Sequence, residues 1–95
     1  MDFEKDLEWF TKDIAPSMSS YEIEYRFFEQ GDFGELNQVE FNSELKGGNI
    51  DFWGLGWIGI HLVDYISGDE IMNVLLEPTE RENINFNLNK LISLL

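Results

Sequence analysis

The chain has no cysteine, and this absence removes a group of structures and reactions at once. Without thiols there is no disulfide framework, no cysteine-ligated zinc or iron–sulfur cluster and no thiol nucleophile. The absence is compatible with a reducing compartment. The segment Met1–Asp6 is acidic and lacks the basic and apolar regions of a secretory signal, so we expect a cytoplasmic protein.

Basic side chains are scarce as well. Six Lys and Arg stand against nineteen Asp and Glu, which gives a formal net charge of −13. Phosphate binding on nucleic acids and attraction to anionic membranes both need positive charge, and no apolar run approaches the ~18 residues of a membrane span. We therefore predict no direct nucleic-acid partner and no membrane partner. A basic protein partner fits the charge, although acidic surfaces also serve solubility alone.

Apolar and aromatic side chains, by contrast, are abundant. Hydrophobic residues make up 43% of the 95 residues, and they include eight Phe, three Tyr and three Trp. This content is enough for one hydrophobic core, and the length is that of one domain. We predict a single α+β domain over residues 1–95.

An amphipathic helix is predicted at the start of the chain, over residues 2–14. Its apolar residues recur at helical spacing, and its first turn is acidic, which suits the positive end of the helix dipole. The helix should end near Ile14, because Pro16 disfavours helical geometry at the residue before it. The apolar positions are Phe3, Leu7, Phe10 and Ile14.

A second amphipathic helix is predicted over the C-terminal residues. Thr79 and Glu82 have the spacing of a capping box directly after Pro78, which should end the sheet. Several asparagines also permit a strand over residues 84–88. The apolar positions at helical spacing are Ile84, Leu88, Leu91, Ile92 and Leu95.

Between the two helices, the sequence alternates with the period of β-strands. The first strand, residues 21–27, places Tyr21, Ile23, Tyr25 and Phe27 on one face and Glu22, Glu24 and Arg26 on the other, so we expect it to be half-buried. Further strands are predicted at 36–45, 50–53, 57–66 and 70–77, with turns at 30–34, 46–49, 54–56 and 67–69. The last two strands are apolar on both faces, which indicates central positions. Because the connections are too short for helical crossovers, we predict an antiparallel meander of about five strands, flanked by an N-terminal and a C-terminal helix.

The sequence offers no complete catalytic or metal-binding motif. His61 is the single histidine, and Asp64, three residues further along the same strand, points to the opposite face, so the two are no acid–base pair. Carboxylates that could pair in a hydrolase site are Asp51, Asp64, Asp69, Glu70 and Glu77, but nineteen acidic residues make chance pairs common. Asp32, Glu35, Asp69 and Glu70 lack the spacing of a calcium loop. We predict no catalytic residue, no metal and no cofactor.

Three glycines, Gly54, Gly56 and Gly59, match the letters of a dinucleotide-binding fingerprint. That fingerprint must open a helix after a strand, whereas Gly59 lies within an apolar, β-branched run. The glycines instead predict a tight turn at Gly54 and Gly56, and a bulge or close backbone approach at Gly59.

Candidate partner-binding residues come from two patterns. Trp53 and Trp57 bracket a turn near Asp51, where they either fill the core or anchor an interface. Acidic residues of the first two strands either form a binding face or protect the edge of the sheet. The full candidate set is Glu22, Glu24, Glu35, Glu40, Glu44, Asp51, Trp53 and Trp57.

The chain is acidic and free of cysteine, with a predicted helix, meander and tail helix. It also contains the stretch Gly48–Tyr65, Gly-Asn-Ile-Asp-Phe-Trp-Gly-Leu-Gly-Trp-Ile-Gly-Ile-His-Leu-Val-Asp-Tyr, which is about a fifth of its length. In these features it resembles the small immunity proteins of bacterial toxin–immunity systems, particularly those paired with contact-dependent growth inhibition toxins. The resemblance implies a protein that binds a cognate toxin domain, often a basic nuclease, and blocks its active site or its access to substrate.

A nucleic-acid mimic or a regulatory protein-binding adaptor fits the same acidic composition. Such a protein would bind several basic DNA-binding proteins, whereas an immunity protein would bind one partner. The number of partners therefore distinguishes the two hypotheses.

Overall fold

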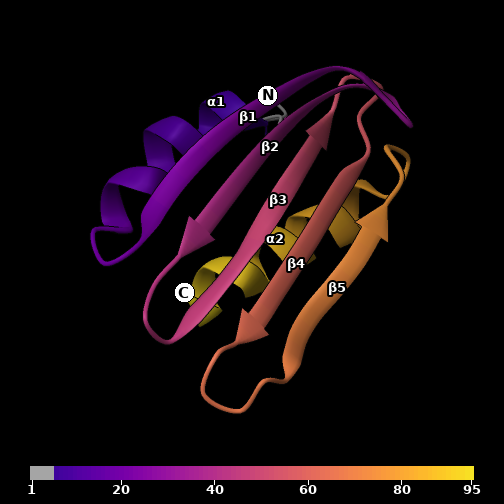
Figure 1. The fold of residues 1–95 in the computed structure, drawn as a ribbon. Helices are drawn as coiled ribbons and strands as arrows, with labels where there is room; N and C mark the ends of the chain where they lie inside the picture. Colours follow the sequence, from indigo (N-terminus) through magenta and orange to yellow (C-terminus); the bar gives the residue numbers. More distant parts are fainter. Residues whose placement is uncertain (1–5) are drawn as a thin grey trace.

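The computed structural model describes residues 6–95 and contains one antiparallel sheet with strands in the order β1-β2-β3-β4-β5 (Figure 1). The predicted α+β class and the five-stranded meander between two helical segments are confirmed. The strands are β1 (Glu22–Gly31), β2 (Gly34–Asn42), β3 (Lys46–Trp53), β4 (Ile58–Asp64) and β5 (Glu70–Leu76). The N-terminal helical segment contains α1 (Leu7–Trp9), and the C-terminal helix is α2 (Arg81–Leu94).

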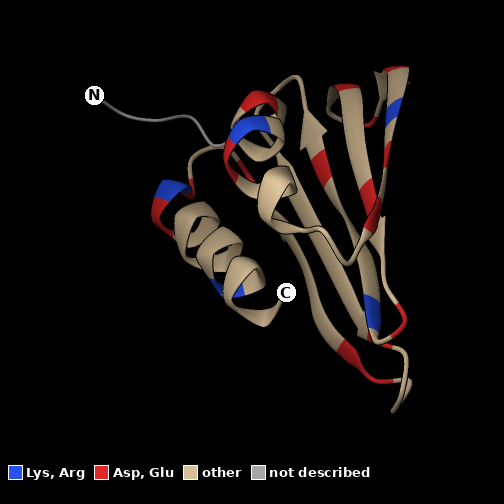
Figure 2. Cartoon of the chain, turned by 90° about the vertical axis from the view of Figure 1, so that its left-hand side faces the viewer, with Lys and Arg blue, Asp and Glu red and all other residues tan. Residues whose placement is uncertain are grey.

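Both helical segments lie on the same face of the sheet, and no helix within residues 6–95 lies on the opposite face (Figure 2). The hydrophobic core fills the space between the sheet and the two segments. It consists of Phe10, Met18, Val39, Phe41, Ile50, Phe52, Ile58, Ile60, Leu62, Met72, Leu88 and Leu91. We call the two sides of the sheet the helix-bearing face and the open face. Neither helix in residues 6–95 has the length and apolar character needed to cross a membrane.

The N-terminal helical segment runs three residues further than predicted. After α1 it continues as a π-helical stretch, Phe10–Ile14, and then as a 3-10 turn, Ala15–Ser17. Pro16 fits there because it stands at the start of the 3-10 turn, where a backbone N–H has no partner within the turn. Phe10 is fully buried, as its spacing predicted. The predicted start of the helix at residue 2, with Phe3, lies outside the described residues.

The C-terminal segment is helical, as predicted, and the alternative strand over residues 84–88 is wrong. The predicted capping box is also wrong, because the N-cap residue is Glu80 and no side chain caps the helix. Thr79 instead donates its hydroxyl to Glu77 Oε1 at 2.9 Å, and Glu80 Oε2 accepts the N–H of Glu77 at 3.0 Å. These side chains form hydrogen bonds within the turn before α2. They do not accept the first N–H groups of the helix.

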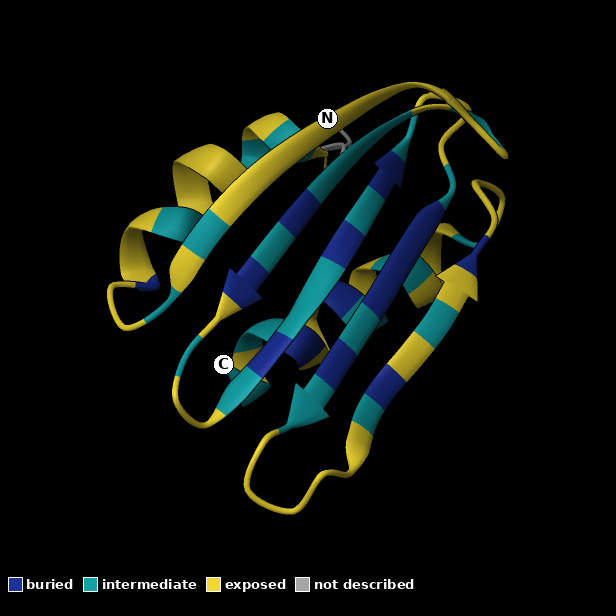
Figure 3. Ribbon diagram, in the orientation of Figure 1, coloured by how far each residue is buried: buried dark blue, intermediate teal, exposed yellow. Residues whose placement is uncertain are grey.

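The edge strand β1 is less buried than its alternation predicted. Tyr21 and Ile23 pack against the core, whereas Tyr25 and Phe27 remain 49% and 59% exposed. They point to the helix-bearing side, but β1 pairs with β2 alone and extends beyond the core (Figure 3). The prediction of a half-buried strand is therefore wrong beyond Ile23. The strand also continues to Gly31, so the following turn is shorter than predicted.

The glycine-rich stretch 46–49 was predicted to be a turn, and this prediction is wrong because the stretch begins β3. A side chain at Gly47 would collide with the hydroxyl of Tyr65, and one at Gly48 would collide with the backbone oxygen of His61. The two glycines therefore permit close approaches within the sheet, which is a recognised use of glycine in strands.

The turn between β2 and β3 lies earlier in the chain, at residues 43–45. Ser43 Oγ accepts the N–H groups of Leu45 and Lys46 at 3.3 and 3.1 Å. Leu45, which was predicted to continue the apolar pattern of the second strand, is exposed in this turn. A serine that binds the following backbone N–H groups is a common turn signal.

The strands β4 and β5 are buried mainly on the face that packs against the core. The core-facing side of β4 is buried as predicted, but its other side belongs to the open face. β5 is an edge strand and not a central one, and Leu75 is exposed. The turns before and after β4 contain Gly56 and Gly68 with φ angles of +94° and +77°, a region that favours glycine. The predicted turns at 54–56 and 67–69 are thus confirmed.

Candidate functional site

The open face collects alternate side chains from all five strands. Because the ladder between β2 and β3 has no bulge, residues that face away from the core stay in register across these strands. The open face contains Glu22, Glu24, Arg26, Phe28, Leu36, Gln38, Glu40, Asn42, Gly47, Asn49, Asp51, Trp53, Gly59, His61, Val63, Glu70, Asn73 and Leu75. Its composition is acidic and amide-rich, with apolar residues concentrated at one end.

The carboxylate of Asp51 lies at the centre of the open face, on the middle strand. Gln38 Nε2 donates to Asp51 Oδ1 at 2.8 Å, and Asn49 Nδ2 donates to the same oxygen at 3.1 Å. Asp51 is half-buried, and in residues 6–95 no cationic group forms an ion pair with it. Two neutral amides on neighbouring positions thus hold a negative charge in a fixed orientation.

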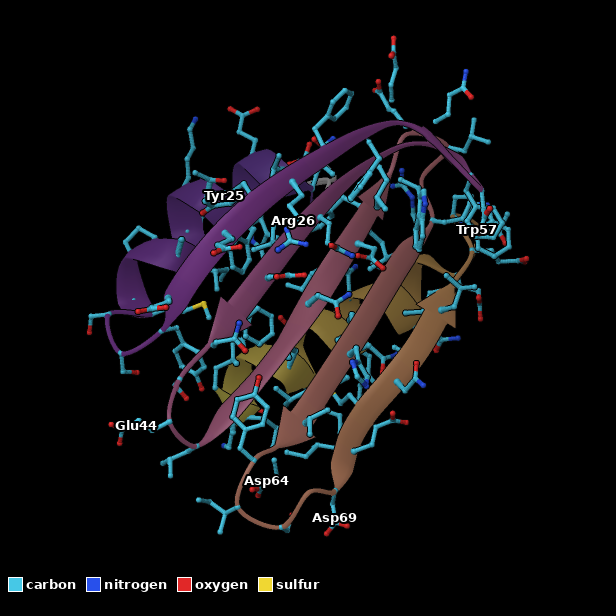
Figure 4. All side chains as sticks on the ribbon, in the orientation of Figure 1. Tyr25, Arg26, Glu44, Trp57, Asp64 and Asp69 are labelled. Atoms are coloured by element: carbon cyan, nitrogen blue, oxygen red, sulfur yellow. The ribbon has the colours of Figure 1, made fainter. Side chains whose placement is uncertain are left out.

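Arg26 supplies positive charge on the open face, from the edge strand β1. Its Nη2 atom lies 3.2 Å from a carboxylate oxygen of Glu24 and 3.2 Å from one of Glu40. Figure 4 shows Arg26 on the side of the sheet turned to the viewer, which is the open face. Since one guanidinium pairs with two carboxylates, the net charge of this part of the open face remains negative.

His61 pairs with Glu70 across β4 and β5, with 3.0 Å between Nε2 and Oε2. The prediction that His61 does not act with Asp64 holds, because Asp64 Oδ1 accepts the backbone N–H groups of Ile66 and Ser67 at 2.8 and 3.2 Å. Asp64 therefore stabilises the turn between β4 and β5. The pair of His61 and Glu70 is partly exposed on the open face.

A shallow hollow of about 240 Å³ lies on the open face above Gly47. Tyr65 forms one wall, and its hydroxyl donates a hydrogen bond to Asn42 Oδ1. Other walls are formed by Glu40, Asn49, His61 and Val63. Gly47 itself is buried, because the hydroxyl end of Tyr65 lies over the position that its missing side chain would take.

Three aromatic rings gather at the end of the sheet formed by the β1–β2 and β3–β4 turns. Phe33 stacks on Trp57 with centroids 3.9 Å apart, and Trp53 meets Phe33 edge-on at 5.3 Å. Trp53 and Trp57 are half-buried, so they neither fill the core nor stand free. Phe33 was not among the predicted site residues. One indication of its role is present in the sequence, namely that an aromatic residue stands alone inside a predicted turn.

The structure brings five of the eight predicted partner-binding residues onto the open face: Glu22, Glu24, Glu40, Asp51 and Trp53. Glu35 is an even number of positions from the core-facing residues of β2, so it lies on the helix-bearing side of the strand, against Gly54. Glu44 lies in the β2–β3 turn and Trp57 in the β3–β4 turn, at opposite ends of the sheet (Figure 4). The acidic face predicted on the first two strands therefore consists of Glu22, Glu24 and Glu40.

The candidate hydrolase and calcium residues do not form a metal-binding cluster. No group of three or more His, Asp or Glu suited to a metal ion occurs within residues 6–95. Asp64 and Asp69 flank the β4–β5 turn, Glu70 pairs with His61, and Glu77 accepts a hydrogen bond from a neighbouring threonine. The carboxylates of Asp64, Glu70 and Glu77 therefore have local structural partners.

A larger groove, of about 1090 Å³, lies on the helix-bearing face between the starts of α1 and α2. Its apolar lining comes from Leu7, Phe52, Leu55, Ile58, Pro78 and Ile84. Asp6, Glu8, Glu82 and Arg81 supply charged side chains around it. Three acidic residues and one arginine surround it, so its excess of negative charge is smaller than that of the open face.

Comparison of the chain with protein-family models, curated proteins and solved structures found no match. Its function is therefore inferred from its own residues. The open face is the candidate site because it combines accessible carboxylates, preoriented amides and an aromatic end.

Proposed function

We propose that this protein is a cytoplasmic immunity protein, which binds one cognate toxin domain of basic character and neutralises it. The observation that carries the proposal is the open face, which no helix of residues 6–95 covers and which displays acidic side chains around a half-buried central carboxylate. The proposal assigns binding to the open face and no catalytic step to any residue of the chain.

The charges of the open face define the partner. Its five carboxylates belong to Glu22, Glu24, Glu40, Asp51 and Glu70, and Arg26 is already engaged by two of them. A nuclease holds nucleic-acid phosphates with Lys and Arg side chains, and carboxylates pair with the same groups. The acidic face would thus occupy the substrate-binding surface of such a toxin.

The apolar end of the open face supplies the second part of the interface. Phe28, Leu36 and Trp53 occupy neighbouring register positions on β1, β2 and β3. Aromatic anchors surrounded by polar groups carry much of the binding energy in protein interfaces. Attraction between opposite charges would make association fast and sensitive to salt, and packing at the aromatic end would make dissociation slow.

A role in solubility accounts less well for Asp51 than a role in binding. Charges that serve solubility alone belong at fully exposed positions, whereas Asp51 is half-buried on the central strand. Gln38 and Asn49 are both oriented toward it. Ordering these two side chains costs conformational entropy. A preoriented carboxylate on an uncovered face supports recognition of a cationic partner.

The proposal is tested by affinity capture of the tagged protein from lysate of its native cells, at low and at physiological salt. We expect one polypeptide, retained in stoichiometric amount at physiological salt, whose expression arrests growth unless this chain is co-expressed. Capture of many basic proteins, all lost as salt rises, would favour the nucleic-acid mimic. Capture of no protein under either condition would contradict both hypotheses.

A further inference from the structure

We infer that the point where Asp51 and Trp53 meet over Gly59 is a receptor for one arginine side chain of the partner. This inference rests on the proposed function, because it names the group that the basic partner would place at the centre of the open face. It is carried by the geometry of three neighbouring residues and by the hydrogen bonds of the amides beside them.

Gly59 is buried beneath the receptor, and the indole ring of Trp53 and the carboxylate of Asp51 lie over it. A Cβ atom at this position would lie 3.1 Å from Cζ3 of Trp53 and 3.3 Å from Oδ2 of Asp51. The indole ring and a carboxylate oxygen therefore converge on one small area of the sheet. Any larger residue at position 59 would have to displace one of them.

The donors around Asp51 leave one of its oxygens available. Both amide hydrogen bonds, from Gln38 and Asn49, end on Oδ1, and within residues 6–95 no donor is bonded to Oδ2. An ionised carboxylate can only accept, so the NH₂ groups of the two amides must face it. Their carbonyl oxygens are then free to accept from another group. The site therefore presents acceptors and an aromatic ring.

Arginine matches this arrangement better than lysine does. Its planar guanidinium can stack on an aromatic ring and donate several hydrogen bonds in its own plane, whereas an ammonium is a compact point charge. Arg26 does not fill the receptor, because it lies two strands away and pairs with Glu24 and Glu40. A guanidinium from outside the chain would satisfy Asp51 Oδ2 and the ring of Trp53 together.

A substitution of the same shape at position 51 separates recognition by the site from folding of the chain. Asparagine at position 51 could accept the same two amide hydrogen bonds through its Oδ1 atom and place an NH₂ group where Oδ2 now lies. The substitution Asp51→Asn thus keeps the shape and the internal bonds. It replaces the available acceptor with a donor and removes the charge.

The test is a titration of the ¹⁵N-labelled full chain, followed by NMR, with Nα-acetyl-arginine amide as the probe. We expect saturable shifts at the indole N–H of Trp53 and at the amides of Asp51 and Gly59, and weaker shifts with Nα-acetyl-lysine amide. Asp51→Asn should weaken binding of the arginine probe about tenfold. The control Glu44→Gln removes the same charge from a distant turn and should change binding by less than about twofold.

Equal weakening by Asp51→Asn and Glu44→Gln, equal shifts with both probes, or no saturable shift at Trp53 would each overturn the inference. The spectrum of Asp51→Asn also reports whether the variant is folded. The two proposals fail separately. If a captured toxin binds the wild-type chain and Asp51→Asn equally well, the arginine receptor is contradicted and the immunity proposal is not. If no toxin is captured but the chain still binds the arginine probe, the immunity proposal is contradicted and the arginine receptor is not.

Discussion

Phe33 stacks on Trp57 with ring centroids 3.9 Å apart and ring planes within 7° of parallel. The two residues belong to different turns, β1–β2 and β3–β4. The backbone also joins the two turns, since Leu55 N donates to the carbonyl oxygen of Phe33 at 3.1 Å. Beside them, Gly54 N donates to the carbonyl oxygen of Glu35, at the start of β2, at 2.7 Å. This contact fixes the end of the sheet that positions Trp53 on the open face.

The substitution Phe33→Ala is expected to destabilise the fold by about 2 kcal/mol, because it removes a stacked pair, an edge-on contact and the associated apolar burial. The free energy of unfolding in urea, followed by circular dichroism, measures this cost. Phe28→Ala is the matched control, since Phe28 is 44% exposed and stacks on no ring within residues 6–95. Equal costs for the two variants would show that the turn contact adds no stability.

The two glycines of β3 are expected to differ in their tolerance of alanine. At Gly48 the added methyl group meets the backbone oxygen of His61, so the strands must separate, at a cost of about 3 kcal/mol. At Gly47 it meets the hydroxyl end of Tyr65, a side chain that can move, and about 1 kcal/mol is lost with the hydrogen bond to Asn42.

Urea unfolding of the two variants checks this order. Gly47→Ala should lower the free energy of unfolding by an even smaller amount in a Tyr65→Ser background, because the obstructing ring is absent there. A larger cost at Gly47 than at Gly48 would contradict the assignment of the two close approaches.

These glycines also show where prediction from sequence fails. Gly47 and Gly48 lie in a run of turn-forming residues, and local propensity alone favours a hairpin there. Their actual role depends on Tyr65 and on the His61 backbone, which come from the following strand. Contacts between strands carry no local signal. The same reasoning applies to Tyr25 and Phe27, whose alternation is correct but whose exposure depends on how far the core extends behind β1.

The meander and the C-terminal helix were predictable because they follow from periodicity and from connection lengths. Alternation also placed Glu22 and Glu24 together on one side of the first strand. It did not separate Glu35 from Glu40, which were expected on one acidic face and lie on opposite sides of β2. The parity of Gln38 and Asn49 was readable too, but their bonds to one oxygen of Asp51 depend on the register between β2 and β3. Phe33 could not be predicted as a partner of Trp57, since 24 positions of chain separate them in the sequence.

Charge reversal on β1 is expected to slow binding of the partner. The double variant Glu22→Lys/Glu24→Lys should reduce the association rate constant about tenfold at low salt, because it reverses two charges on the open face. Surface plasmon resonance with the captured partner measures the rate. The matched control Asp13→Lys/Glu44→Lys makes the same change in net charge away from the open face and should have an effect of less than about threefold. Equal effects would point to net charge and not to the open face.

The excess of acidic residues predicts that salt stabilises the protein. Like charges repel more weakly when screened, so the urea midpoint should rise as NaCl increases from about 0.02 to about 0.5 M. The variant Glu29→Gln/Asp32→Asn removes two charges from the tip of the β1–β2 hairpin and should show a smaller salt effect. A midpoint that falls as salt rises would mean that the ion pairs of the chain, such as Arg26 with Glu40, outweigh the repulsion.

The central claim is that the open face binds the partner, and side-chain footprinting tests it most directly. Hydroxyl radicals oxidise exposed aromatic and histidine side chains, and mass spectrometry compares the free chain with its complex with the captured partner. The account predicts protection of Trp53 and His61 in the complex, with no change at Phe86, which is 66% exposed on α2. Protection of Phe86 without protection of Trp53 and His61 would place the interface on the helix-bearing face and contradict the account.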